Sequence, residues 1–518
     1  MATADIATGG GTAAMPVKHH GWLTVGVMGA MVMQILDTTI ANVALPHMQT
    51  SLGATMDSVS WVLTSYIVAA AIATPVTGWL ADRFGSRNLF LFAVGTFIFA
   101  SMLCGAATNL ETMVAFRIFQ GVAGAFIGPL SQTVMLDINP PERHAKAMSM
   151  WGMGVMIGPI MGPVLGGWLT ENYNWRWVFY VNLPIGILTL ALLWALLPSR
   201  GQTKRSFDVT GFAMLSVALA SFQLMLDRGP HEDWFASWEI IIEAAVAFGA
   251  FWMFLVHLLT AKKPLFERQM FKNRNLATGL MFMVVIGITS MAPMALLPPM
   301  LQQLYGYPVI DTGMLLAPRG VGVFITMFIG GQLMGRGVDP RYLIASGLLI
   351  SSWSLWHMAH WSLDIGWQTV AISGFVQGLG MGFAFMPLNA MAFITLPPQW
   401  RTDGASSLNL IRSLGSSAGI SMVTALLSRN TQISHSDLAA HITSFSIDGM
   451  DPTLAQALGS TGDTVLSMAN AEVTRQAMMI AYLDDFYLMS IITLLALPLV
   501  LLLQGPPRGA KLEKIVAE

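Results

Sequence analysis

Long stretches without a charged side chain are the feature that most restricts how this chain can fold. Leu89–Leu103, Trp177–Leu197 and Met489–Leu503 contain no Asp, Glu, Lys or Arg. With their flanks they approach the roughly 20 residues that a helix needs to cross a bilayer. Of the 518 residues, 54% are hydrophobic and 10% are charged, which is too apolar for a water-soluble core of ordinary proportions. The chain is therefore predicted to be an all-α integral membrane protein.

Hydropathy predicts fourteen membrane-spanning helices. Their approximate bounds are 21–43, 58–79, 88–106, 112–136, 147–169, 176–197, 207–227, 236–260, 276–299, 310–333, 341–360, 368–394, 404–428 and 484–504. This even number of spans places both ends of the chain on the same side of the membrane.

The basic residues test this topology, because Lys and Arg collect in cytoplasmic loops. With the N-terminus inside, 19 of the 26 basic residues fall on the cytoplasmic side. The outer side receives Arg176, Arg228, Arg429 and Arg475, and the spans contain Arg117, Arg319 and Arg412. The asymmetry predicts two cytoplasmic tails, 1–20 and 505–518, of which the first is expected to be disordered.

Short sequence matches indicate an internal repeat. Gln120-Gly121 returns as Gln377-Gly378. This match and three others occur in the same order in both halves, and the two copies of each are 252 to 257 residues apart. Parallel halves of this kind occur in secondary transporters, with the substrate cavity between them. The predicted organisation is a first six-helix half at 21–197, two inserted helices within 198–275, and a second six-helix half at 276–504.

The segment 429–483 is the one long connection between predicted spans, and it falls on the outer side. It is rich in polar residues but contains helix-compatible stretches at 453–458 and 469–482. Two interpretations stay open for this predicted periplasmic loop: a plain surface loop, or a docking site for a periplasmic partner.

Asp37 is placed deep within the first predicted span. An ionised carboxylate at the middle of a membrane helix costs about 2.5–3.5 kcal/mol even on the lenient insertion scale, so such a residue is rarely incidental. A carboxyl group of this kind can exchange protons with an aqueous cavity. We therefore predict that Asp37 couples transport to protons. The alternative is a carboxylate permanently paired with a cation between helices.

Arg117, in the fourth predicted span, is the expected partner of Asp37. A guanidinium stays charged in proteins, so it needs an anion or a polar cavity. The second half has Gly374 where the repeat would place Arg117, which predicts that proton chemistry is confined to the first half. Alternatively, Arg117 only holds helices together.

The connection between the second and third spans contains a pattern of glycines and charges at Gly78, Asp82, Arg83, Gly85 and Arg87. Glycine permits a tight turn and a close approach of helices. Asp can accept hydrogen bonds from a helix N-terminus, and Arg can pair with carboxylates or helix C-termini. The pattern predicts a cytoplasmic latch that changes with conformation, or else a static loop that fixes the topology.

The fifth predicted span carries small residues and prolines at regular spacing. Small residues let two helices bring their backbones together, and prolines within a helix favour a kink. A bent, tightly packed helix that seals one side during gating is therefore expected from Gly154, Gly158, Pro159, Gly162, Pro163, Gly166 and Gly167.

Polar, aromatic and thioether side chains within the spans are candidates for substrate binding, because flexible thioethers and aromatic rings suit a pocket for varied apolar ligands. The candidates are Gln34, Asn42, Gln120, Trp151, Arg319, Gln377, Met381, Phe385, Asn389 and Arg412. Arg319 and Arg412 have no evident partner and can meet anionic substrates or bond neighbouring helices. Glu239, Glu243 and His257, in the inserted pair, are expected to be interfacial or structural.

Motifs of catalytic, metal and nucleotide sites do not occur in the contexts that they require. The lone Cys104 gives neither a disulfide framework nor a thiolate metal site, and no basic patch suggests nucleic-acid binding. We predict no enzyme activity, no metal and no cofactor. Transport is expected to use the proton motive force rather than ATP.

These motifs resemble those of the major facilitator superfamily, within it the fourteen-helix drug:proton antiporter branch, and most closely EmrB-type exporters. Asp37 and its neighbours resemble the branch's first-helix motif, and Gly78–Arg87 the superfamily loop motif. Arg117–Gly124 resembles the proton-coupling motif, and Gly154–Gly167 the antiporter motif. The resemblance covers residues 21–504 and implies the major facilitator fold, with two six-helix halves and two inserted helices. It departs at Ser86, where a basic residue is usual, and at Pro163, where glycine is usual.

The resemblance implies a proton-coupled multidrug efflux antiporter that exports hydrophobic small molecules across a bacterial inner membrane by alternating access. It also implies a tripartite pump with a periplasmic adaptor protein and an outer-membrane channel. Two alternatives stay open: a stand-alone exporter of a metabolite, fatty acid or siderophore, and a membrane receptor or scaffold that transports nothing.

Overall fold

The structure, a computed structural model, describes residues 19–199, 205–230, 232–441 and 462–505, together with Met15 and Val17. These residues form α-helices and short 3-10 turns and contain no strand. The predicted tails lie largely outside the described residues.

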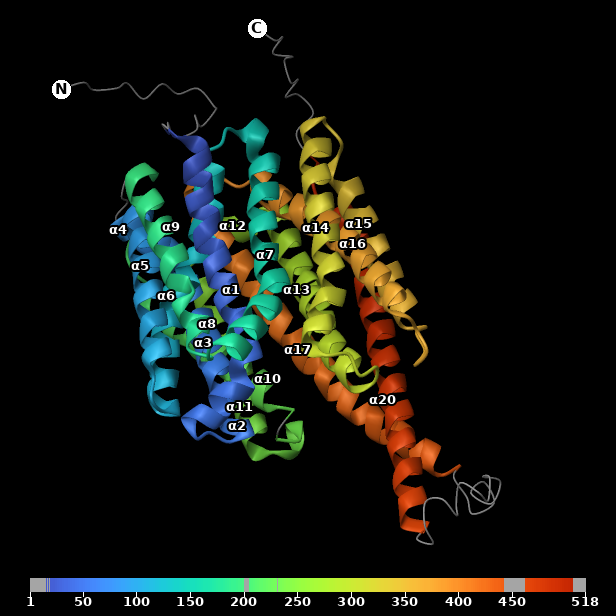
Figure 1. Cartoon of the computed structure of the whole chain (residues 1–518). Helices are drawn as coiled ribbons and strands as arrows, with labels where there is room; N and C mark the ends of the chain where they lie inside the picture. The colour runs from blue at the N-terminus through green and yellow to red at the C-terminus, as the bar shows by residue number, and fades with distance from the viewer. Residues whose placement is uncertain are drawn as a thin grey trace, which may run out of the picture.

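The helices follow the predicted order of two halves and an inserted pair (Figure 1). The first half contains α1 (His20–Leu52), α2 (Met56–Val59), α3 (Trp61–Ala73), α4 (Thr77–Phe84), α5 (Ser86–Ala106), α6 (Leu110–Asp137), α7 (His144–Asn172), α8 (Trp177–Tyr180) and α9 (Asn182–Leu196). Between the halves lie α10 (Val209–Arg228), α11 (Trp238–Thr260) and α12 (Arg268–Phe271). The second half contains α13 (Arg274–Gln303), α14 (Val309–Gly335), α15 (Pro340–Met358), α16 (Trp367–Ile394), α17 (Arg401–Ala439) and α20 (Gly462–Leu495).

The ends of several helices follow from local sequence. A 3-10 turn at Thr74–Val76 separates α3 from α4, where Pro75 cannot donate a backbone hydrogen bond. Gly85 then joins α4 to α5 with φ at 86°, a backbone conformation that favours glycine. Asn109 caps α6 by accepting a hydrogen bond from the backbone of Thr112.

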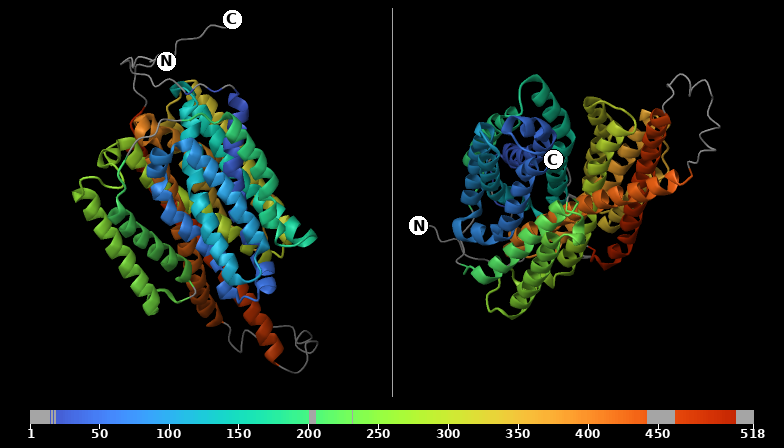
Figure 2. Two further views of the ribbon diagram at one scale, coloured as in Figure 1. Left: turned by 90° about the vertical axis from the view of Figure 1, so that its left-hand side faces the viewer. Right: turned by 90° about the horizontal axis from the view of Figure 1, so that it is seen from below.

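The two halves repeat the same helix pairing. In the first half α1 packs on α7, while α3 and α5 pack on α6; in the second half α13 packs on α17, while α14 and α15 pack on α16. The halves stand side by side, as the view along the bundle in Figure 2 shows. The predicted major facilitator arrangement of two six-helix halves and two extra helices is confirmed.

The inserted pair lies against the seam between the halves. Helix α10 packs on α3 of the first half and α17 of the second. Gln223 donates a hydrogen bond to Ser417 Oγ (3.0 Å), and Ser421 donates to the Leu226 carbonyl (2.5 Å). On the other side Thr64 bonds Asp227. Helix α10 is therefore fixed to both halves.

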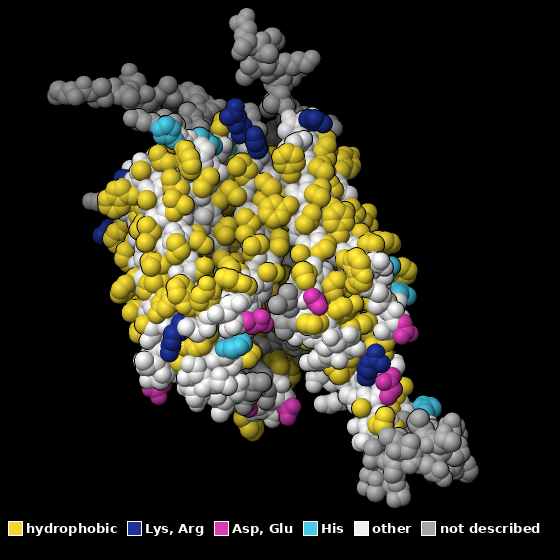
Figure 3. Space-filling view, in the orientation of Figure 1, with side chains coloured by type: hydrophobic (Ala, Val, Ile, Leu, Met, Phe, Trp, Pro, Cys, Tyr) yellow, Lys and Arg dark blue, Asp and Glu magenta, His cyan; other side chains and the backbone are white. Residues whose placement is uncertain are grey.

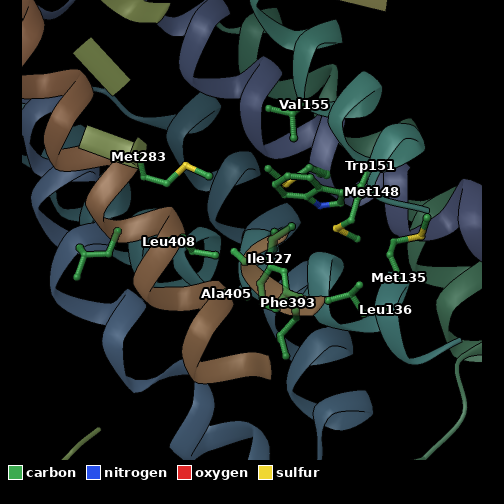
Figure 4. Close-up of a cluster of buried hydrophobic side chains, with 14 of the residues drawn as sticks. Ile127, Met135, Leu136, Met148, Trp151, Val155, Met283, Phe393, Ala405 and Leu408 are labelled. Carbon is green, nitrogen blue, oxygen red and sulfur yellow. The ribbon is translucent and has the colours of Figure 1, made fainter. Parts of the chain in front are cut away.

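The hydrophobic core is shared between the halves at one end of the bundle only. We call the end where α1 begins the predicted cytoplasmic end, and the opposite end the predicted outer end. Toward the cytoplasmic end one cluster joins both halves, for example Ile127, Trp151, Phe393 and Leu408 (Figure 4). Toward the outer end the core divides into one cluster in each half. The halves therefore share a core at the cytoplasmic end. Toward the outer end their cores are separate, although α7 of the first half still packs on α14 of the second, where Val164 lies beside Gly313.

The surface agrees with a membrane setting. Hydrophobic side chains cover the middle of the face in Figure 3, while Lys and Arg gather at the predicted cytoplasmic end. Thirteen helical segments of the described chain are long and apolar enough to cross a membrane. The predicted span 341–360 is not among them; it corresponds to α15, which has 19 residues.

Serines lower the hydropathy of α15, and neighbouring helices bond the hydroxyls of Ser352 and Ser354. Ser352 donates to the carbonyl of Ser490 on α20, and Ser490 donates back to the carbonyl of Ser352, each at 2.9 Å. Ser354 donates to the carbonyl of Ser373 on α16 (2.8 Å).

The segment 429–483 differs from the predicted loop. Helix α17 continues to Ala439 and α20 begins at Gly462, so both ends of the segment are helical. His435 and Asn470 join them with a 3.0 Å hydrogen bond. The prediction was wrong because it ended each helix where the apolar residues end, although 429–441 contains neither Gly nor Pro. The helix-compatible stretch 469–482 is helical, and 453–458 lies outside the described residues.

Candidate functional site

The buried pair of Asp37 and Arg117 forms the centre of the candidate site. Both side chains are 0% exposed, and Arg117 Nη1 lies 2.6 Å from Asp37 Oδ2. The other carboxylate oxygen accepts hydrogen bonds from Gln120 Nε2 (2.8 Å) and Asn182 Nδ2 (2.7 Å). Arg117 also donates to Gln120 Oε1 (2.7 Å) and to the Val62 carbonyl (2.9 Å). Side chains from α1, α6 and α9 therefore meet at one carboxylate.

Close packing of α3 on α6 brings this pair together. A Cβ at Gly121 would lie 2.5 Å from the Tyr66 carbonyl, so a larger residue would push α3 away. The Tyr66 ring then lies 4.4 Å from the guanidinium carbon of Arg117, a cation–π contact. Arg117 Nη2 and Asn182 Oδ1 are buried without a hydrogen-bond partner among the described residues. The cluster therefore keeps one donor and one acceptor available for other partners.

Two members of the cluster were missed in the sequence. Asn182 and Ser101 lie within apolar stretches, and Asn182 Nδ2 also donates to Ser101 Oγ (3.0 Å). The Asn182 amide within an apolar stretch was a signal for a buried polar contact, but its partner Asp37 is 145 residues away in the sequence. Cys104, expected to be a packing residue, lies buried with Sγ 3.5 Å from Gln120 Oε1.

The glycine-and-charge pattern belongs to a polar cluster at the predicted cytoplasmic end. Arg205 Nη1 lies 2.7 Å from Asp403 Oδ2 on α17 and 3.8 Å from Asp82 Oδ2 on α4. A Cβ at Gly78 would lie 1.6 Å from Asp403 Oδ1, so glycine permits α17 to approach α4. Burial lowers the pKa of Arg205, but the carboxylates of Asp403, Asp82 and Glu267 together more than offset this, and the net pKa lies above its usual value.

The remaining residues of the pattern lie around the α4–α5 turn. Gly85 makes the turn, Arg83 is exposed, and Arg87 donates to the Trp194 carbonyl near the C-terminus of α9 (2.8 Å). The pattern alone did not identify Arg205 or Asp403, because each comes from a distant part of the chain.

A second ion pair joins the halves at the same end. Arg401, the first residue of α17, lies 2.9 Å from Asp137 at the end of α6. Further inside, Gln132 donates to Asn389 Oδ1 (2.9 Å) and accepts from Asn409 Nδ2 (3.1 Å). These contacts between the halves close the predicted cytoplasmic end in this conformation.

The glycines of α7 pack within the first half. A Cβ at Gly158 would lie 2.3 Å from Ile35, and one at Gly162 would lie 2.1 Å from Thr39 Oγ1, both on α1. Gly154 and Gly166 face Met28 and Ile40 of the same helix, whereas Gly167 has no atom within 4 Å of its Cβ position. Pro159 and Pro163 lie within α7. The glycine face therefore holds α7 against α1.

The candidate substrate residues are divided among several environments. Trp151 stacks on Phe385 across the halves with ring centroids 6.2 Å apart. Gln34 Oε1 lies near Gly128, beside Asn409. Met381 and Asn389 are buried in α16, and Asn42 is exposed. The structure thus brings Gln34, Trp151, Phe385 and Asn389 to the seam, whereas Gln120 belongs to the Asp37 cluster.

The remaining three candidates, Arg319, Gln377 and Arg412, also lie in the second half. Arg319 donates to the Ser290 carbonyl (2.7 Å), and both amide atoms of Gln377 are buried without a partner among the described residues. In the inserted pair, Glu239 pairs with Arg228 and His257 lies 2.9 Å from Asp208.

A bundle of paired membrane helices in two like halves, with an ion pair buried in one of them, defines a multi-pass membrane transporter. Sequence comparison then identifies the family. A model of the Major Facilitator Superfamily matches residues 27–420, and the chain belongs to this family.

Curated relatives cover nearly the whole chain. It is 36% identical over 496 residues to the fatty acid resistance protein FarB of Neisseria gonorrhoeae, covering 94% of this chain and 96% of FarB. It is 34% identical over 493 residues to the multidrug export protein EmrB of Escherichia coli strain K12, with the same two coverages.

Solved structures support the fold. The proton:xylose symporter XylE matches with a TM-score of 0.59 at 12% identity, covering 92% of this chain and 94% of that one. The human organic anion transporter MFSD10 matches with a TM-score of 0.60, also at 12% identity, covering 92% of this chain and 99% of that one.

Proposed function

We propose that this chain is a proton-coupled exporter of hydrophobic small molecules. The observation that carries the proposal is Asp37, a fully buried carboxylate whose two oxygens accept hydrogen bonds from Arg117, Gln120 and Asn182. Proton uptake by Asp37 would change the charge of the buried pair from zero to plus one. The Arg117 guanidinium would then have no carboxylate beside it and could form hydrogen bonds with other groups. Binding of one proton thereby acts directly on the packing of α1, α6 and α9.

Alternating access links this proton step to transport. The halves are in contact at the predicted cytoplasmic end through Arg205–Asp403 and Arg401–Asp137, and their cores are separate toward the outer end. Opening inward requires these ion pairs to break. Moving one proton through 100 mV releases about 2.3 kcal/mol. A hundredfold substrate gradient requires about 2.8 kcal/mol, so one proton with a modest pH difference suffices.

The names of the relatives support hydrophobic substrates. EmrB is named a multidrug export protein and FarB a fatty acid resistance protein. The stacked pair of Trp151 and Phe385 at the seam supports a pocket for apolar ligands. A fatty-acid exporter is the second candidate function, favoured by the FarB likeness.

Replacing Asp37 by Asn tests the proposal. The amide keeps the size of the side chain but cannot take up a proton. In proteoliposomes, we expect Asp37→Asn to abolish efflux of a fluorescent hydrophobic dye driven by a pH gradient, while dye binding stays measurable. Asp364→Asn, at an exposed carboxylate between α15 and α16, is the matched control and should transport normally.

Full transport by Asp37→Asn would refute proton coupling at this residue and leave a structural ion pair. Wild-type vesicles that show neither dye flux nor dye-dependent proton flux would instead favour a receptor or scaffold. These two outcomes can be told apart, because the first is seen in the Asp37→Asn variant and the second in the wild-type protein.

We further propose a bacterial inner-membrane location with cytoplasmic termini and assembly with a periplasmic adaptor and an outer-membrane channel. The gathering of Lys and Arg at one end supports the orientation. The helical ends of α17 and α20 beyond the apolar region support a docking surface. Crosslinking from cysteines at Ser436 and Glu472 should capture the adaptor, whereas Tyr342→Cys at the other end should not. Equal capture from all three positions, or none from the first two, would contradict this assignment.

A further inference from the structure

The repeat allows the buried site of the first half to be compared with its counterpart in the second half. A Cβ at Gly121 would touch the Tyr66 carbonyl at 2.5 Å, and a Cβ at Gly378 would touch the Arg319 carbonyl at 1.9 Å. Gly378 follows Gly121 by 257 residues and Arg319 follows Tyr66 by 253, which matches the offsets of the sequence repeat. Arg319 therefore occupies the place that Tyr66 occupies beside the ion pair.

The two halves place a guanidinium in this region from different helices. In the first half it comes from α6, as Arg117. In the second half Gly374 stands at that place in α16, and its Cβ position lies 3.7 Å from the Arg319 Cβ. The guanidinium of the second half comes from α14, and Arg319 Nη2 donates to the Ser290 carbonyl on α13 (2.7 Å).

Arg117 has a carboxylate partner, whereas Arg319 has none among the described residues. Arg117 has Asp37 at 2.6 Å, whereas no ion pair of Arg319 occurs among the described residues. Helices α13 and α16 contain no acidic residue, α14 contains Asp311 alone, in its first turn, and α7, which also packs on α14, contains Glu171 alone, in its last turn. Asp311 and Arg319 are eight residues apart, about 12 Å along a helix. The positive charge of Arg319 therefore lacks a counter-ion from the helices that surround it.

Two further groups give this region the chemistry of an anion site. Gln377 is the counterpart of Gln120, which bonds both Asp37 and Arg117; both amide atoms of Gln377 are buried and unpartnered in the described chain. The Arg412 carbonyl packs on Gly287, one turn of α13 before Ser290. The backbone of a second arginine therefore lies beside the same part of α13. No ion pair of Arg412 occurs among the described residues.

An arginine has five donor hydrogens, and Arg319 uses one of its nitrogens on a carbonyl. Carboxylate and sulfonate groups match the remaining guanidinium edge with two parallel hydrogen bonds. Arg319 is buried with 8% of its surface exposed, so an anion bound there would be shielded from water.

We propose that Arg319 binds the anionic head group of amphiphilic substrates, which are organic acids with an apolar tail. The proposal rests on the exporter function above and names a substrate class for it. The second half then supplies the cation for the substrate, while the first half retains its own carboxylate for the proton.

A pair of probes with equal tails and opposite permanent charges tests this assignment. Octanesulfonate and octyltrimethylammonium are titrated by calorimetry into the full chain in nanodiscs of zwitterionic lipid, with protein-free nanodiscs subtracted. We expect wild type to bind the sulfonate more tightly than the ammonium. We expect Arg319→Gln to weaken sulfonate binding at least tenfold, to leave ammonium binding within twofold, and Arg319→Lys to retain part of the affinity.

The control is Arg336→Gln, which makes the same change at an exposed arginine that follows α14 and should leave both affinities unchanged. Wild type that prefers the ammonium probe overturns the proposal, whatever the variants do. A folded Arg319→Gln protein that binds the sulfonate as tightly as wild type, or loses both probes equally, overturns it as well. Proton-driven efflux of an uncharged dye by wild type separates these results from failure of the exporter function.

Discussion

Replacing Asp403 by Asn tests whether the cluster around Arg205 holds the predicted cytoplasmic end closed. Asp403 belongs to α17 of the second half, and its nearly buried carboxylate lies 2.7 Å from Arg205 Nη1. Arg205 in turn reaches Asp82 on α4 of the first half at 3.8 Å. Asn preserves the shape of the side chain and removes the charge that draws Arg205 toward α17.

The size of the effect follows from the partial exposure of Arg205. Hydrogen bonds to charged groups contribute about 1.5–3 kcal/mol to stability. The Arg205 side chain is 21% exposed and keeps Asp82, so solvent and the second carboxylate replace part of the loss. We therefore expect the closed state to lose about 1–2 kcal/mol, which is a factor of about 5–30 in its equilibrium with the open state.

Spin labels on the two halves measure this equilibrium. Asn88 on α5 and Tyr342 on α15 are exposed at the predicted cytoplasmic end, and pulsed electron resonance reports the distance between labels there. Both Asp403→Asn and Gly78→Ala should increase the population of long distances, because a Cβ at Gly78 would collide with Asp403 Oδ1. Unchanged distance distributions in both variants, with wild-type unfolding temperatures, would refute the reasoning.

Two further predictions concern packing and the second ion pair. Gly162→Leu should lower stability in a thermal unfolding assay by about 1–3 kcal/mol through overpacking against Thr39, whereas Gly167→Ala, with open space at its Cβ, should not. Asp137→Asn and Arg401→Gln should each open the predicted cytoplasmic end, and the double variant should show a coupling of about 0.5–3 kcal/mol in the same distance measurement. Additive effects would mean that the 2.9 Å pair contributes nothing to closure.

The helical bundle and its buried ion pair could be predicted because both signals are local in the sequence. An apolar stretch of sufficient length has few structures available to it in a membrane, and a charge within it must be neutralised or solvated. Asp37 and Arg117 were therefore recognisable one by one, and their pairing followed from the shortage of other partners. The ends of α17 and α20 were not recognisable in this way, since a helix can continue into water after its apolar residues end.

The contacts that close the cytoplasmic end could not be predicted, because they join residues far apart in the chain. Asp403 and Arg205 are separated by 198 residues, and each alone is an ordinary charge near a predicted membrane surface. Gln132 and Asn409 likewise pair across 277 residues. The sequence repeat located the two halves but did not by itself show which side chains meet between them. Gln132 and Asn389, which are 257 residues apart and therefore counterparts in the repeat, bond each other across the seam.

Helix α6 is the element that connects the proposed proton site with the closed end. It carries Arg117 beside Asp37, then Gln132 at the seam between the halves, and ends at Asp137, which pairs with Arg401 of the second half. Arg117 and Asp137 are 20 residues apart, about 30 Å along a helix. Under the proposed function, a change in the charge of Asp37 would alter the partners of Arg117 at one position of this helix. The polar contacts at the other end can exist only while α6 stays close to α16 and α17. Coupling between proton and gate would then require no relay of side chains, because a small shift of α6 would change both sets of contacts.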